Sequence, residues 1–161
     1  MIATFLLEFF GAIYAIIRYK MDRVGFITVL ILTCLSVFQI AEYMICEVIN
    51  LPGLTWARIG YVAITLLPPL GISLMMAIAN KKSLITQLIL YFVAGSFIVY
   101  FLFIAHALTN QVCSGNYVIF TASEDISKIY GLYYYGLLAI TVFFSFQWTH
   151  HVKSVGRQKA L

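Results

Sequence analysis

The sequence predicts an all-α integral membrane protein, a bundle of five transmembrane helices. Hydrophobic residues fill 63% of the 161 positions, and charged residues fill only 10%. The mean hydropathy of +0.97 is higher than a soluble domain of this length needs for its core. The apolar residues form five long runs separated by polar connections: residues 2–17, 24–49, 55–79, 84–108 and 129–149. We therefore expect one compact transmembrane domain over residues 1–149.

Four of these runs are long enough to cross a bilayer, because ~20 helical residues span a hydrocarbon core of ~30 Å. The first run has 16 residues. It would have to thin the bilayer or continue into the basic residues that follow it. The connections are short except for residues 109–128, which include a strand-like segment at 117–121. A loop of this length is usually functional or mobile, and its apolar centre predicts that it folds back over the bundle or dips into the interface.

The basic residues predict the orientation of the chain in a cell membrane. Eight of the ten Lys and Arg residues follow the first, third and fifth runs, whereas only Arg58 and Lys128 fall on the other side. Because cytoplasmic loops carry the excess of positive charge, we expect the amino terminus outside and the carboxyl terminus inside. Residues 150–161 would form a short basic cytoplasmic tail on anionic headgroups. The formal charge of +4 comes from these few loop cations and does not indicate nucleic-acid binding.

Glu42 is the leading candidate for a functional residue. It lies deep in an apolar run, where a carboxylate is costly and usually marks a site. At helical spacing it shares one face with Gln39 and Cys46, so this face should look toward other helices. Counting ~1.5 Å per residue from the ends of the runs places polar and aromatic residues in one outer layer: Glu8, Glu42, Arg58, Tyr61, Tyr100, His106, Tyr133 and Tyr134. If they face inward, they line a pocket that opens outward beneath the 109–128 loop.

The roles of several residues in this layer stay open. Arg58 is the expected partner of Glu42, or it extends to lipid phosphates. Glu8 could share a proton or a cation with Glu42, or it lies near the headgroups because the first run is short. Other aromatic residues are expected in the interfacial belt without a binding role: Trp56, Tyr117, Tyr130 and Trp148.

The cysteines and prolines suggest two structural features near this layer. Cys46 and Cys113 are expected on the same non-cytoplasmic side, where disulfides persist. They either form a bridge that ties the loop to the helix of Glu42 or remain free thiols, since sequence does not give their separation. Pro68 and Pro69 lie in the middle of the third run and free two backbone carbonyls, those of Ile64 and Thr65. They predict a kink or break that acts as a hinge or only shapes packing.

These landmarks resemble the seven-span membrane sensor region found ahead of some bacterial and archaeal histidine kinases. That pattern has a glutamate late in its second span, a Trp and a Tyr opening the third, and a proline midway down the third. It also has a histidine near the end of the fourth span and an aromatic-rich start to the fifth. The matching positions lie within about 24–149: Glu42, Trp56, Tyr61, Pro68 with Pro69, His106, and Tyr130 with Tyr133–Tyr135. Only five spans are expected here, and no signalling domain follows, so the resemblance implies a stand-alone or partnered ligand-sensing module of unspecified ligand.

The leading hypothesis is a membrane ligand-binding or sensory module that binds a small molecule, lipid or cation around Glu42. The alternatives are a transporter or proton-coupled channel using Glu42 and Glu8, a hydrolase with a metal held by Glu42, His106 and Glu8, or a structural subunit of a membrane complex. No zinc-protease, phosphate-loop or nucleophile-elbow motif is present. An enzyme is therefore not the favoured interpretation, and any cofactor is left open. The expected partners are membrane lipids and either a second copy of the chain or another membrane protein, with no nucleic acid.

Overall fold

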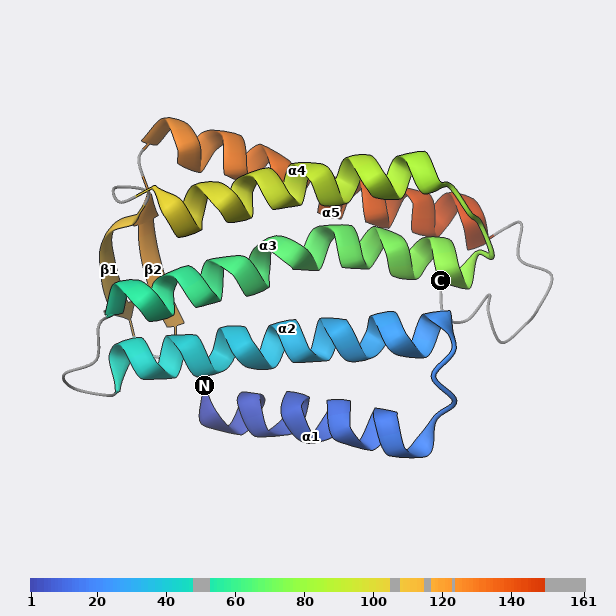
Figure 1. The fold of residues 1–161 in the computed structure, drawn as a ribbon, viewed down its shortest axis with the longest axis horizontal. Coiled ribbons are helices and arrows are strands. Elements are labelled where there is room, and N and C mark those ends of the chain that lie inside the picture. The colour runs from blue at the N-terminus through green and yellow to red at the C-terminus, as the bar shows by residue number, and fades with distance from the viewer. Residues whose placement is uncertain (48–52, 105–107, 115–116, 123, 150–161) are drawn as a thin grey trace.

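The computed structural model is a bundle of five helices with a β-hairpin at one end (Figure 1). It describes residues 1–47, 53–104, 108–114, 117–122 and 124–149. The elements, in chain order, are α1 (Ile2–Arg18), α2 (Arg23–Cys46), α3 (Gly53–Ile78), α4 (Leu84–Phe103), β1 (Leu108–Ser114), β2 (Tyr117–Ala122) and α5 (Glu124–Thr149). The five predicted helices are present, and a small antiparallel sheet is added to them.

Four helices, α2 to α5, are long and apolar enough to cross a membrane, with mean hydropathies between 1.5 and 2.3. Helix α1 has 17 residues, which extend ~26 Å and fall short of a ~30 Å hydrocarbon core. Large apolar side chains on the outside of the bundle are exposed, among them Leu84 (83%) and Leu132 (77%). Length, composition and this apolar exterior together indicate a membrane protein.

Helix α3 is the centre of the bundle. It contacts α2 on one side and α4 and α5 on the other (Figure 1). The crossing with α2 is close because small residues meet there: a Cβ added to Gly60 would lie 3.5 Å from the Cβ of Ala41 and 3.6 Å from the ring of Phe38. In lipid, where apolar burial between helices contributes little, such close packing of small residues holds helices together.

Helix α1 lies antiparallel to α2 and begins short of the hairpin end of the bundle (Figure 1). The Thr4 hydroxyl donates to Oε1 of Gln39 at 2.9 Å, and a Cβ on Gly11 would lie 3.9 Å from Cδ1 of Leu32. Both contacts define one register, in which Glu8 is level with position 35 of α2. Glu42 is seven residues farther along α2, ~10 Å closer to the hairpin. The two carboxylates therefore differ in depth, contrary to the expectation that they share one layer.

The segment between α4 and α5 differs most from the sequence-based boundaries. Helix α4 ends at Phe103, and Leu108, which was expected in the fourth span, begins strand β1. Strand β2 coincides with the strand-like segment at 117–121, and β1 pairs with it through Gln111↔Phe120 and Cys113↔Val118. Helix α5 starts at Glu124, five residues before the expected start. Acidic residues at its beginning complement the helix dipole, which explains why the helix extends beyond the apolar run.

Candidate functional site

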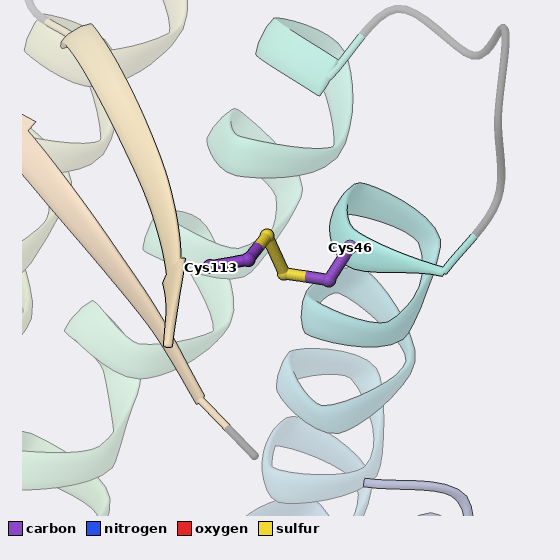
Figure 2. The surroundings of a disulfide bond; sticks show 2 residues. All are labelled: Cys46 and Cys113. Atoms are coloured by element: carbon purple, nitrogen blue, oxygen red, sulfur yellow. A yellow bond between two sulfur atoms is a disulfide. The ribbon is translucent and has the colours of Figure 1, made fainter. Parts of the chain in front are cut away.

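A disulfide joins Cys46, the last residue of α2, to Cys113 in β1 (Figure 2). Their Cα atoms are 5.8 Å apart, a usual separation for bridged cysteines. Of the two alternatives that the sequence left open, the structure contains the bridge. The hairpin also contacts α2, α3 and α5, so the covalent bond holds it against the ends of three helices. We call this end of the bundle the hairpin end.

Glu42 lies one helical turn before Cys46 and is only 4% exposed. Its side chain therefore faces neighbouring parts of the protein and not the acyl chains, as the polar stripe on α2 predicted. The neighbouring Ala41 is fully buried, so this turn of α2 is enclosed. One turn corresponds to ~5 Å along the axis, which places the carboxylate just inside the bundle from the tethered hairpin. A carboxylate at such a position needs hydrogen bonds, an opposite charge or a proton to be stable.

The remaining polar residues of the predicted site lie at several levels. Gln39 is half-buried and accepts the hydrogen bond from Thr4. Arg58 is half-buried on α3, and its predicted pairing with Glu42, a residue that does interact with other groups of the protein, stays a prediction. Glu8 is half-buried on α1, and its Oε2 has no hydrogen-bond partner within the ranges that the structure describes. His106 lies outside the described residues.

Aromatic side chains from α3, α4 and α5 form a cluster in the same half of the bundle. Tyr61 stacks on Phe101 with ring centroids 4.3 Å apart, and Tyr130 meets Phe101 edge-on at 5.3 Å. Phe97 contacts Tyr130 at 5.4 Å and Tyr133 at 4.9 Å. These five residues are called the aromatic cluster below. Offset and edge-on pairs of this kind are favourable beyond the area they bury, so the cluster joins three helices firmly.

The tyrosines at the start of α5 point in different directions, some toward the interior of the bundle and one outward. Tyr133 is 9% exposed, whereas Tyr135 is 72% exposed. Tyr134 is half-buried and reaches Tyr130 with ring centroids 6.2 Å apart. Tyr100 on α4 similarly lies at the edge of the cluster, 5.5 Å from Phe101. Tyr130, which was expected in the interfacial belt, belongs instead to the interior, because the helix turns it toward α3.

The two prolines lie inside an α3 that continues through them. Pro69 has no N–H and cannot donate to the carbonyl of Thr65, four residues earlier. The Tyr133 hydroxyl donates to that carbonyl at 2.8 Å. Helix α5 therefore supplies the hydrogen bond that the proline removes from α3, which reconciles a proline pair with an unbroken helix.

The side chain of Thr65 extends this connection. Its hydroxyl donates to the Tyr61 carbonyl at 2.6 Å and lies 3.1 Å from the Tyr130 hydroxyl. Since the Thr65 proton is used on α3, the Tyr130 hydroxyl is the donor between the two. Thr65 is fully buried, and both of its oxygens bond to α5. The sequence predicted that the prolines free the Thr65 carbonyl, but it did not indicate that Thr65 is the contact point with α5.

Two grooves on the described part of the bundle lie away from Glu42. One of 390 Å³ is almost wholly apolar and runs between α2, α3 and α4, with Cys34, Ala63 and Leu102 among its lining residues. A larger open groove of 770 Å³ includes Arg23 and Lys82 and lies at the opposite end from the hairpin. Among the described residues no group of three His, Cys, Asp or Glu side chains could hold a metal ion. The predicted pocket around Glu42 remains a prediction, and so does the metal-dependent hydrolase, because His106 of its expected ligand set lies outside the described residues.

No protein-family model, curated protein or solved structure matches this chain. The resemblance to the sensor region of histidine kinases therefore stays a prediction, and the function must be argued from the geometry.

Proposed function

We propose that the chain is an integral membrane ligand-binding or sensory module whose site lies around Glu42 at the hairpin end. One observation carries this proposal: a carboxylate that is 4% exposed lies one helical turn from a disulfide-tethered hairpin. Ionisable groups inside a transmembrane bundle are expensive, and they are retained mainly where they act. A covalently anchored cover beside such a group favours a shaped binding site over simple helix packing.

The chemistry of this end favours a ligand with a positively charged or hydrogen-bond-donating group. An ionised carboxylate in a low-dielectric interior attracts a cation more strongly than it would in water. The aromatic cluster nearby offers ring faces that suit organic cations and apolar bodies. A small amine, a lipid with a cationic headgroup or a simple cation would fit this combination.

The contact between α3 and α5 supports a way for binding to be transmitted. Thr65 is bonded to Tyr130 and Tyr133 at the turn that precedes Pro69. A ligand that shifts the start of α5 would strain these hydrogen bonds and so bend α3 at the proline. A ligand moves such an equilibrium only by its difference in affinity for the two arrangements. A partner membrane protein that contacts the exposed apolar faces would respond to the altered positions of α3 and α5.

A proton-coupled transporter is the second candidate. Among the residues that the structure describes, none hydrogen-bonds to Oε2 of Glu8, and a carboxyl without such a partner is less costly to enclose in its neutral, protonated form. The register of α1 on α2 separates Glu8 and Glu42 by ~10 Å along the bundle axis. Two carboxyl groups at different depths are what a proton pathway along the bundle would need. Proton flux into liposomes that is lost in both Glu8→Gln and Glu42→Gln would favour this function over the first.

The direct test of the leading proposal is ligand-dependent thermal stability of the detergent-solubilised protein. The panel should contain organic amines, metal cations and lipids. A ligand at 100 times its Kd stabilises a protein by about 2.7 kcal/mol, so a true ligand raises the melting temperature clearly. Glu42→Gln should fold but lose this response. Glu47→Gln is the matched control, because Glu47 is exposed at the end of the same helix. A panel without effect on the native protein, or an equal response in Glu42→Gln, would contradict the proposal.

A further inference from the structure

The end of the bundle opposite the hairpin, called the basic end here, carries a strong excess of positive charge. The α1–α2 and α3–α4 connections bring five cations to it: Arg18, Lys20, Arg23, Lys81 and Lys82. Asp22 is the one acidic residue in these two connections. Its carboxylate accepts the Gly25 N–H at 2.8 Å and caps α2, so it is held by the helix start. Five cations against one carboxylate leave this end with a net positive charge, which favours an anionic ligand.

The open groove of 770 Å³ lies among these basic residues. Arg23 comes from the start of α2, and Lys82 comes from the α3–α4 connection, so two cations far apart in sequence share one groove. Ser83 and Gln87 add hydroxyl and amide groups to its wall. Helix α4 also begins here, with Ser83 as its cap, and a helix start carries partial positive charge from its N–H groups. The groove thus has the donors that a phosphate group requires.

The other wall of the groove is apolar and continues along α4. Leu84 and Ile85 line the groove and are 83% and 75% exposed, and Leu88, one turn farther along the helix, is 70% exposed. A free inorganic anion would gain nothing from this wall. A phospholipid would place its headgroup beside the two cations and its acyl chains along the exposed face of α4. Basic pockets between transmembrane helices are known to take anionic headgroups in this way.

We infer that this groove binds an anionic phospholipid, with the headgroup phosphate held by Arg23 and Lys82 and the acyl chains packed on Leu84, Ile85 and Leu88. The site is independent of Glu42 and lies at the other end of the bundle. It would make the stability of the protein depend on the lipid composition of its membrane.

Lys81 allows a specific site to be separated from general surface charge. Its Nζ lies 4.9 Å from the centre of the Trp148 ring, and the residue is not part of the groove lining. Replacing Lys81 or Lys82 by Gln removes the same charge from adjacent positions. A diffuse attraction to anionic lipid would weaken equally in both variants, whereas a site in the groove would weaken mainly in the Lys82 variant.

The experiment measures binding of phosphatidylglycerol to the purified full chain by native mass spectrometry, with phosphatidylcholine as the neutral lipid. Thermal unfolding in nanodiscs of the same lipids gives a second readout. Each lost cation should weaken phosphatidylglycerol binding about fivefold, in Arg23→Gln and in Lys82→Gln. Lys81→Gln should change it less than about twofold, and binding of phosphatidylcholine should change in none of them. Leu84→Asn should also weaken phosphatidylglycerol binding, because the acyl wall is made polar.

Three results would overturn the inference. Equal losses in Lys81→Gln and Lys82→Gln would show a diffuse electrostatic attraction. Stabilisation by inorganic phosphate equal to that by phosphatidylglycerol would show an anion site without a lipid. Equal binding of the two lipids by the native protein would show that the groove does not select headgroup charge.

Discussion

The two ends of the bundle differ in how they treat polar groups: the hairpin end encloses them, whereas the basic end leaves them exposed. At the hairpin end, a disulfide, a hairpin and the aromatic cluster enclose polar groups, and Glu42 is 4% exposed. At the basic end the connections are short, their charges are exposed, and an open groove lies between them. Enclosed polar groups require fixed partners, because an unsatisfied one costs free energy. Exposed charges need none, so the hairpin end should be rigid and specific, whereas the basic end should respond to its surroundings.

The largest difference should come from the disulfide. Reducing it, or replacing both Cys46 and Cys113 by Ser, should destabilise the protein by up to about 4 kcal/mol according to the chain-entropy estimate for a long loop, since the two residues are 67 positions apart. Thermal unfolding with and without reductant measures this. Cys34 is the free cysteine, so Cys34→Ser should respond to reductant as the native protein does. If reductant does not lower the melting temperature of the native protein, the disulfide does not make the hairpin end more rigid than the basic end.

The second effect tests whether α5 completes the hydrogen bonding of α3. Tyr133→Phe removes the donor to the Thr65 carbonyl and should destabilise the protein by about 1–2 kcal/mol, as measured by unfolding in detergent. Tyr135→Phe is the control and should have little effect, because Tyr135 is 72% exposed. Equal losses in the two variants would mean that the Tyr133 hydrogen bond does not stabilise the helix pair.

The third effect asks whether Pro69 is the reason that Tyr133 is needed. Pro69→Ala restores an N–H four residues after Thr65, which can donate to the same carbonyl. In that background Tyr133→Phe should cost less than it does alone, with a coupling of about 1 kcal/mol in the double-mutant cycle. Additive effects would show that the proline and the tyrosine act independently.

The smallest effect is expected at the basic end. Lys81→Gln removes the contact with the Trp148 ring and should destabilise the protein by less than about 1 kcal/mol, since such contacts are weak where both groups reach solvent. Unfolding in detergent again gives the value. A loss as large as that of Tyr133→Phe would remove the distinction between a rigid hairpin end and an adaptable basic end.

Much of the bundle could be predicted from the sequence because a bilayer leaves few alternatives. A long apolar run in lipid must satisfy its own backbone hydrogen bonds, so it forms a helix. A carboxylate in such a run must face inward, and Glu42 does. Polar residues of α3 follow the same rule, since Thr65 and Ser73 are 0% and 2% exposed.

Other features depend on how the helices meet, and the sequence does not contain that information directly. Counting depth from the end of each run assumes that all runs begin at one level, but α1 begins short of the hairpin end, so Glu8 lies deeper than expected. The depth of a residue also does not say which face of the helix its side chain occupies. Tyr133 and Tyr134 were therefore placed in one layer without distinction, although Tyr133 is the more buried of the two, and Tyr130 was assigned to the interface although it lies within the aromatic cluster.

Pairing between distant segments was the least predictable feature. Strand β1 has a polar sequence, and its extended form is stabilised by pairing with β2, since strand preference depends strongly on the neighbouring strand. The bridge between Cys46 and Cys113 similarly depends on a distance across the fold. The sequence predicted that this loop folds back over the bundle, but the pairing of β1 with β2 and the bridge to α2 emerged only from the structure.

The central claim is that the Glu42 carboxylate binds a ligand at the hairpin end, and an experimental density map of the protein purified in native lipid tests it most directly. The account predicts non-protein density in contact with the Glu42 carboxylate, beside the Cys46–Cys113 bridge. A carboxylate enclosed entirely by protein side chains, with no such density and no space for it, would contradict the account and leave Glu42 as a helix-packing residue.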